Sequence, residues 1–250
     1  MNRKNEFKKY AVKHMGMSST TVEDYEKYQA KNYGLTPMVL EERQLNMTQL
    51  SVFDRLMLDR ILWVSGVVDD QMSDIVQAQL LFLESNDPDR DISMYLDTPG
   101  GSCQSGLNIA QMMQYVKPDV ATINVGTCAS MGSVLLSVGT PGKRSSTISS
   151  KVMLHHVSSG SGGVIDEMRI NQMEAEKYNF LLFKMLAQNC GKTFEEVHDL
   201  ASRDLWLNSD EAKGFGIIDH IIGLEKNKSI TELMDGFDDY YDKYVYSRKK

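Results

Sequence analysis

Cysteine, histidine and long hydrophobic runs are all scarce in this 250-residue sequence. Three cysteines (Cys103, Cys128 and Cys190) are an odd number without metal-binding spacing, which predicts reduced thiols in a cytoplasmic protein. No apolar run approaches the roughly 18 residues of a membrane span. No apolar segment follows the basic N-terminus, so a secretory signal is not predicted either. No basic patch dominates and the net charge is −7, which argues against nucleic acid as a partner.

The composition is that of a globular protein, with 42% hydrophobic and 24% charged residues. The length allows one large domain or two small ones. Residues 1–34 are polar and charged and are interpreted as an N-terminal extension, a candidate propeptide. Residues 34–50 show no clear period and are interpreted as a loop or a hairpin arm. From residue 225 to 250 the chain becomes charged and tyrosine-rich, which predicts a tail with little core.

Between these ends, segments typical of strands alternate with segments typical of helices. Strands are expected at 60–66, 92–96, 120–125, 150–157 and 216–222. Helices are expected at 53–59, after Asp69 or Asp70, at 105–116, after Ser130, at 166–188 with Gly191 as its C-cap, and from Thr193 with Glu196 in a capping box. This alternation predicts an α/β fold with parallel βαβ units.

The most informative stretch is G-T-C-A-S-M-G-S-V-L-L, which spans Gly126–Leu136 between a β-branched run and a helical apolar run. Ser130 is therefore expected where a strand gives way to a helix. The first N–H groups of a helix are unpaired and favour negative charge, as an oxyanion requires. Ser130 is thus a candidate nucleophile, and the alternative is that it only caps the helix.

A second turn rich in small residues, Pro99-Gly100-Gly101, follows the strand expected at 92–96. Glycines let a backbone approach a ligand closely and direct its N–H groups toward it. A plain turn is the alternative. Two such turns now follow two strand ends, and active sites of α/β folds gather at the carboxyl ends of strands.

A serine nucleophile needs a base, and His155 is the best of the five histidines. Strand alternation directs His155 and His156 to opposite faces, which argues against a two-histidine metal pair. A histidine in a buried strand is also often a satisfied core residue. Asp204 is a candidate acceptor for the base, although a helix-end cap explains it equally well.

Five motifs occur in register: D-T-P-G-G-S, K-P-D-V-A-T-I, G-T-C-A-S-M-G-S-V-L-L, K-V-M-L-H and R-D-L-W-L-N-S-D-E-A-K-G-F-G-I-I-D. Together they resemble the proteolytic subunits of the ATP-dependent Clp protease family, over 35–222. The resemblance implies a serine endopeptidase with Ser130 as nucleophile, His155 as general base and Asp204 as its orienting acid. It further implies that the N–H groups of Gly101 and Met131 form the oxyanion hole.

The same resemblance implies a crotonase-like spiral of repeated β-β-α units in a peptidase domain of residues 35–224, with a protruding handle helix within 158–188. It implies a homo-oligomer of two stacked heptameric rings, a tetradecamer that encloses the active sites. A AAA+ unfoldase would deliver unfolded proteins and use the ATP, so no cofactor or metal is expected in this subunit. Tyr95 and Tyr115 fall where the family docks its ATPase, although both are equally well explained as core aromatics.

Three positions depart from the family pattern. His156 and Val157 replace a Gln-Pro pair after the base, and the loss of the proline leaves the direction of the His155 side chain less fixed. Asp97 replaces an asparagine before the P-G-G turn. A regulatory ring subunit and a crotonase-type acyl-CoA enzyme are the rival functions. The complete Ser/His/Asp set argues against the first, and the lack of a basic cluster for the CoA phosphates argues against the second. A membrane serine/lysine protease is disfavoured because no membrane span is found.

Overall fold

The computed structural model describes residues 38–43, 46–160, 162–223 and 229–245, in two units, Met1–Leu56 and Met57–Lys250. The expected extension 1–34 and parts of the tail (residues 224–228 and 246–250) lie outside the described residues. In the first unit, β1 (Met38–Arg43) pairs with β2 (Asn46–Ser51) in antiparallel register, which confirms the hairpin expected within residues 34–50. Helix α3 (Val52–Leu58) begins directly after β2.

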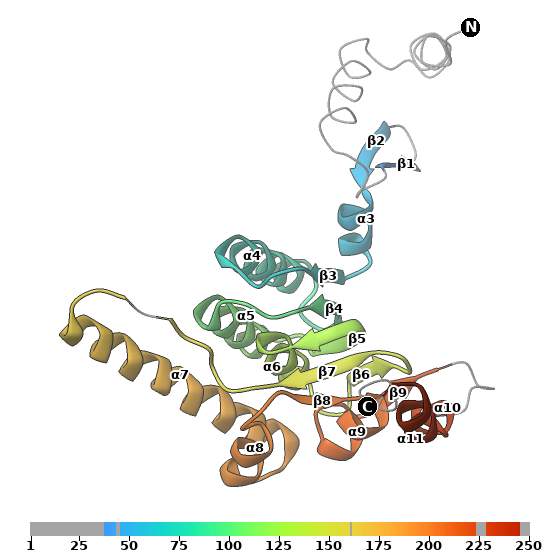
Figure 1. Cartoon of the computed structure of the whole chain (residues 1–250). Coiled ribbons are helices and arrows are strands. Elements are labelled where there is room, and N and C mark those ends of the chain that lie inside the picture. Colours follow the sequence, from blue (N-terminus) through green and yellow to red (C-terminus); the bar gives the residue numbers. More distant parts are fainter. Residues whose placement is uncertain (1–37, 44–45, 161, 224–228, 246–250) are drawn as a thin grey trace, which may run out of the picture. The chain divides into compact units, whose positions relative to one another are not determined.

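The second unit is built on a seven-stranded, mostly parallel sheet (Figure 1). Its main path runs through β3 (Ile61–Ser65), β4 (Ile92–Thr98), β5 (Val120–Ala129), β6 (Arg144–Thr147) and β9 (His220–Ile222). Off this path, β7 (Lys151–Leu154) pairs with β5 in parallel and with β8 (Leu205–Leu207) in antiparallel register. The predicted α/β fold with parallel strands is therefore confirmed.

The first three strands of this sheet are each followed by a helix, as the βαβ pattern requires. These are α4 (Asp70–Asn86), α5 (Cys103–Tyr115) and α6 (Met131–Val138). Asp69 caps α4 by accepting the N–H of Met72, which resolves the choice between Asp69 and Asp70. The apolar faces of strands and helices form one core, whose fully buried members include Leu80, Met94, Leu96, Ile109 and Leu135.

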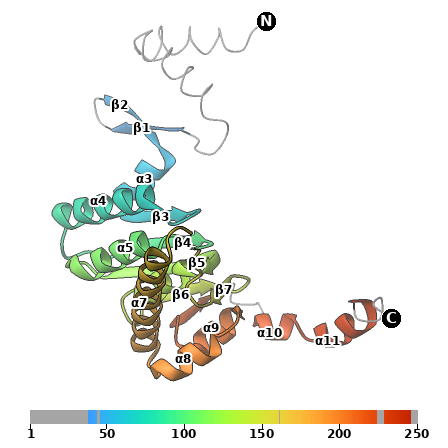
Figure 2. The same cartoon turned by 60° about the vertical axis from the view of Figure 1, so that its left-hand side comes forward.

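Helix α7 (Ile165–Cys190) is buried only toward its C-terminal end, at Leu182, Phe183, Leu186 and Ala187. Its N-terminal half extends away from the sheet in Figure 1, and in Figure 2, where that side comes forward, the helix lies in front of the sheet. Apolar side chains there, among them Ile165, Ile170 and Met173, are exposed. Gly191 ends the helix in the left-handed conformation (φ 65°), which confirms the predicted C-cap.

The remaining helices follow the sequence signals closely. Helix α8 (Phe194–Leu200) starts with the predicted capping box of Thr193 and Glu196, and α9 (Ser209–Phe215) starts with a second box. The described part of the tail forms α10 (Ile230–Leu233), α11 (Phe237–Tyr240) and the π-helix η1 (Tyr241–Val245). Thr231 fastens α10 to α9, because its N–H and its hydroxyl both donate to Asp210.

Arg144 forms a partly buried ion pair with Asp219 and also joins the C-terminal end of α7 to the sheet. Arg144 of β6 donates from Nη2 to Oδ1 of Asp219 at 2.6 Å and from Nε to Oδ2 at 2.9 Å. The same guanidinium donates to the carbonyl of Asn189, in the last turn of α7, at 2.9 Å. The Arg144 guanidinium holds the pKa of Asp219 below its usual value. The lower part of α7 is thereby fixed to the sheet.

Candidate active site

Ser130 lies at a strained turn between β5 and α6. Its φ of 53° and ψ of −121° are unusual for a residue with a side chain. Such a conformation costs about 1–3 kcal/mol and occurs mainly at functional sites. The hydroxyl makes no capping hydrogen bond with α6, so the alternative role of Ser130 as a helix cap is not supported. The turn leaves the hydroxyl free for a partner on another strand.

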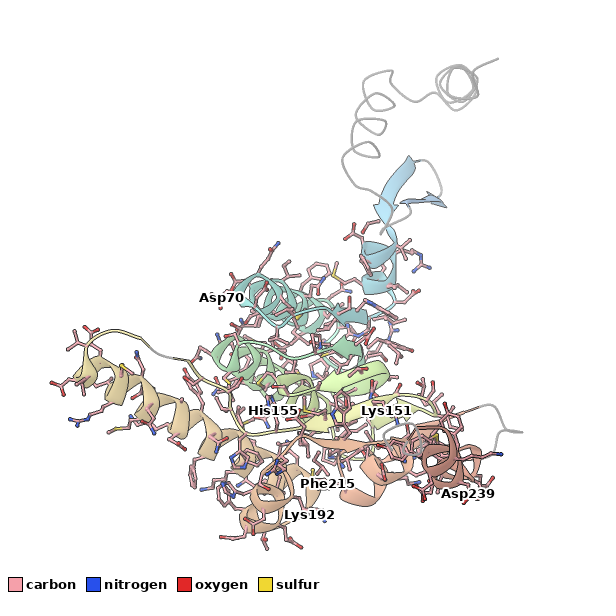
Figure 3. All side chains as sticks on the ribbon, viewed as in Figure 1. Asp70, Lys151, His155, Lys192, Phe215 and Asp239 are labelled. Atoms are coloured by element: carbon pink, nitrogen blue, oxygen red, sulfur yellow. The ribbon has the colours of Figure 1, made fainter. Side chains whose placement is uncertain are left out.

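That partner is His155, and the sheet brings it there. Ala129, the last residue of β5, is the register partner of Met153 in β7, and the N–H of Ser130 donates to the carbonyl of Met153 at 2.9 Å. His155 follows the end of β7 (Figure 3), and Ser130 follows the end of β5. Both residues therefore lie at the carboxyl ends of neighbouring parallel strands. Ser130 Oγ lies 2.8 Å from Nε2 of His155, which is hydrogen-bond distance.

Asp204 lies next to His155 because β8 pairs with β7. The distance from Nδ1 of His155 to Oδ1 of Asp204 is 4.0 Å. This is too long for a hydrogen bond but close enough for an electrostatic interaction. The carboxylate side chain is 66% exposed and that of the histidine is 25% exposed. The alternative role of Asp204 as a helix-end cap finds no support, because a strand follows it directly.

The predicted oxyanion donors also border this site. Met131 is the first residue of α6, so its N–H belongs to the unpaired first turn. The Gly100–Gly101 turn packs tightly against its surroundings. A β-carbon at Gly100 would lie 2.8 Å from the nitrogen of Met131, and one at Gly101 would lie 2.2 Å from the carbonyl oxygen of Val68. Only glycine therefore allows this approach, which sequence reasoning had proposed from the P-G-G motif.

These groups border a single cleft with a volume of about 60 Å³. Gly101, Ser130, Met131 and His155 line one part of it. The rest of the lining is largely apolar and comes from the start of α5, from α6, from β7 and the residues after it, and from the buried end of α7. It consists of Cys103, Ser133, Val134, Leu154, Val157, Ser158, Leu182, Phe183 and Leu186. The cleft thus offers an apolar surface directly beside the nucleophile.

The three departures from the family pattern each have a definite place. The carboxylate of Asp97 accepts the N–H of Thr127 at 2.9 Å and so ties the end of β4 to β5. Nε2 of His156 donates to the carbonyl of His198 at 3.1 Å, and the N–H of Val157 donates to Oδ1 of Asn179 at 2.9 Å. Sequence reasoning did not single out Asn179, since a polar residue on a helix gives no signal of such a contact.

The described residues contain no group of three or more histidine, cysteine, aspartate or glutamate side chains able to hold a metal ion. Within those same residues no helix is both long and apolar enough to cross a membrane. The three cysteines are free thiols, with Cys128 buried and Cys103 and Cys190 half-buried.

A serine hydrogen-bonded to a histidine, next to the backbone N–H groups of a helix start, is an arrangement typical of serine hydrolases. Comparison with known proteins gives the family. The family model of the Clp protease matches residues 44–225. The chain belongs to the Clp protease family; it is a serine-type peptidase with the function of a proteolytic subunit, as the motifs predicted.

Several curated relatives carry the description "ATP-dependent Clp protease proteolytic subunit". The one from Bacteroides fragilis is 45% identical over 218 residues, covering 87% of this chain and 98% of the relative. The one from Porphyromonas gingivalis is 43% identical over 224 residues, covering 90% and 99%. The one from Bacteroides thetaiotaomicron is 44% identical over 218 residues, covering 87% and 98%. The similarity thus spans nearly the whole length of these relatives.

Proposed function

We propose that the chain is the peptidase subunit of an ATP-dependent protease, in which Ser130 is the nucleophile and His155 the general base. The 2.8 Å distance between Oγ and Nε2 is the observation that carries this proposal. Oγ attacks the carbonyl carbon of the scissile peptide bond while Nε2 takes its proton. The oxyanion that forms accepts hydrogen bonds from the N–H groups of Gly101 and Met131.

His155 then returns its proton to the leaving amine, and the C–N bond breaks to give an ester on Ser130. Water attacks this acyl-enzyme with His155 again acting as base, and the acid product leaves. Asp204 orients the imidazole by accepting its Nδ1–H. This requires the exposed carboxylate to close the gap of 4.0 Å, and catalytic hydrogen bonds are often longer in the unliganded enzyme than in the substrate complex. None of these steps calls for a cofactor.

The substrates that fit the site are extended, unfolded polypeptides. A small apolar cleft beside the nucleophile gives little discrimination among side chains. The names of the relatives describe ATP-dependent proteases, and we infer a AAA+ unfoldase as the partner that unfolds and delivers the chains. Tyr115 is 74% exposed, so its alternative role as a core aromatic is not supported, and Tyr95 stacks on Trp63 at 5.8 Å. Tyr115 is therefore available to a docking partner, and Tyr95 is half-buried.

The protruding half of α7 supports an oligomer. Its apolar side chains Ile165, Ile170 and Met173 are not buried within the subunit, and exposed apolar surface of this kind often marks a protein–protein contact. We propose that this handle joins two stacked rings of seven subunits in a cytoplasmic tetradecamer, with residues 35–224 as the peptidase domain. Residues 1–34 are then a propeptide, and residues 225–250 an added tail.

A fluorophosphonate ester tests the active-site assignment directly, because it reacts only with an activated serine. Intact mass should show one adduct per subunit, and peptide mapping should place it on Ser130. Ser130→Ala should abolish the adduct and peptide hydrolysis while leaving the oligomer unchanged, and His155→Ala should remove the adduct too. Normal turnover in Ser130→Ala would show that another residue is the nucleophile.

The assembly has its own test. Ile170→Glu places a charge on the exposed apolar face of α7 and should reduce the native mass from two rings to one, whereas Arg169→Glu, at an exposed polar position next to it, should not. Native mass spectrometry gives both stoichiometries. An unchanged mass in Ile170→Glu would place the ring contact elsewhere.

A further inference from the structure

The general base lies just outside the regular sheet. β7 ends at Leu154, so the ladder that fixes residues 151–154 does not include His155. The orientation of the imidazole therefore depends on what holds the chain on its far side, at residues 156 and 157. No proline fixes the backbone there.

Two hydrogen bonds hold that far side, and both cross to a helix distant in sequence. The N–H of Val157 donates to Oδ1 of Asn179 in α7 at 2.9 Å. Nε2 of His156 donates to the carbonyl of His198 in α8 at 3.1 Å. The ring of His156 also packs against Phe183, with centroids 4.9 Å apart, and against His198, with centroids 4.4 Å apart. His155 thus lies between the sheet on one side and two helices on the other.

Asn179 is well placed to act as a fixed support. Its neighbour Tyr178 donates from its hydroxyl to Oε1 of Gln104 in α5 at 2.7 Å. One turn later, Leu182 and Phe183 are buried in the core. This part of α7 is therefore held on two sides, unlike its exposed N-terminal half.

Beyond Val157 the chain separates from α7. A polar cleft of about 350 Å³ opens there, and its lining consists of His156, Val157, Ser159, Gln172, Ala175, Glu176 and Asn179. Asn179 and Val157 both line this cleft. Without their hydrogen bond, the open cleft leaves room for the backbone after His155 to move.

We propose that Asn179 is a positioning residue for catalysis, which fixes the base His155 by accepting the N–H of Val157. The inference rests on the proposed role of His155. A hydrogen-bonded side chain here does what a rigid backbone would do, since it restricts residue 157 without contacting the substrate. Loss of the bond lets the imidazole leave the reach of Ser130 Oγ, and small displacements of a base slow the reaction strongly.

Asn179→Ala tests the proposal in the full-length assembly. Fluorophosphonate reaction gives two separate quantities, the number of reactive serines and the rate at each. We expect the number of sites and the native mass to stay unchanged, while the rate per site falls by about five- to tenfold, as for the loss of one hydrogen bond. The kcat for a fluorogenic peptide should fall by the same factor with little change in KM.

Two variants serve as controls. Asn179→Asp keeps an acceptor oxygen in the same place and should retain the rate per site to within about threefold. Asn171→Ala removes the same side chain from an exposed position about two turns earlier in α7 and should leave the rate unchanged. An equal loss in Asn171→Ala and Asn179→Ala would attribute the effect to the helix and overturn the proposal.

A double-mutant cycle tests whether Asn179 acts on His155 through the N–H of Val157. Val157→Pro removes the N–H that Asn179 accepts, so Asn179→Ala should have no further effect in that background, whatever Val157→Pro does alone. If the effects of Val157→Pro and Asn179→Ala add, the proposal is overturned. It is also overturned if Asn179→Ala lowers the number of reactive serines while each remaining serine reacts at the normal rate. A wild-type protein without a Ser130 adduct would overturn the proposed function and this inference together. If the wild-type protein forms the Ser130 adduct and Asn179→Ala reacts at the same rate per site, only the role of Asn179 is overturned.

Discussion

Leu154 and Leu205 are register partners in the antiparallel pair of β7 and β8. His155 follows the first of them and Asp204 precedes the second, so one pairing brings both side chains to the same end of the two strands. The parallel pairing of β7 with β5 does the same for Ser130. Strand register therefore brings the three residues of the proposed triad close together, and the contacts of residues 156 and 157 with α8 and α7 hold the chain that follows His155.

Asp204→Asn should lower kcat/KM for a peptide substrate by about 10²-fold or more, because the amide cannot hold the imidazolium that forms during the reaction. Asp199→Asn is a matched control, since this carboxylate is 84% exposed and lies beside another histidine, His198. Steady-state kinetics give both values. A loss below threefold in Asp204→Asn would mean that His155 needs no carboxylate partner.

Gly101→Ala should reduce peptide hydrolysis by about 10²-fold, the effect of losing one oxyanion donor. The added β-carbon would lie 2.2 Å from the carbonyl oxygen of Val68, and φ is +152°, so the turn must shift. Gly142→Ala is the control, because φ is +83° there but no atom lies within 4 Å of the new β-carbon. It should lower the melting temperature without changing kcat/KM. Full activity in Gly101→Ala would exclude this N–H from the reaction.

The pair Arg144–Asp219 should make stability depend on acid pH. The pKa of Asp219 is lower in the folded protein than in the unfolded chain, so its contribution is complete above the unfolded pKa and is lost as pH falls through the folded pKa. At pH 7, Asp219→Asn should destabilise the fold by on the order of 2 kcal/mol, because Arg144 is only 8% exposed. Denaturant unfolding should show the difference from wild type shrinking as the pH falls below about 4.

The control for this pair is Asp89→Asn, which removes an exposed partner of Lys117. It should have little effect at either pH, as is usual for exposed ion pairs. A constant difference between Asp219→Asn and wild type from pH 7 to pH 3 would contradict the assigned pKa shift.

Alkylation of Cys103 should inhibit the peptidase, because this thiol lines the cleft beside Ser130. Burial raises the pKa of Cys103 above the usual 9.0, and the thiolate is the reactive form, so the rate of inactivation should still be rising above that pH. Burial raises the pKa of Cys190 to about 11 and that of Cys128 further, so both should react more slowly. Cys103→Ser should be resistant, and an alkylated enzyme with full activity would contradict the placement of Cys103.

The sequence predicted the central elements well, because apolar periodicity and caps are local signals. Thr193 with Glu196 and Gly191 mark helix ends through hydrogen bonds within a few residues, and each was found as expected. From the sequence, β5 is expected to end at Val125. It continues to Ala129 because Thr127, Cys128 and Ala129 pair with β7, and small residues that usually form a turn are held in the sheet by a distant strand.

The opposite error occurred at β7, which was expected to reach Val157. It ends at Leu154 because the next residues bond to α7 and α8 instead of to a neighbouring strand. The family motifs pair Ser130 with His155, and the two side chains lie within hydrogen-bond distance. The 4.0 Å gap to Asp204 and the support from Asn179 depend on side chains from distant elements, which local patterns do not encode.

The order of the strands along the chain has a consequence for synthesis. The proposed nucleophile and base lie in the first two-thirds of the chain, but β8, which carries Asp204 into place, lies after the whole of α7. A ribosome must therefore complete more than 200 residues before the strand pairing that assembles the triad is available. The proposed triad therefore cannot assemble until β8 has been synthesised and has paired with β7.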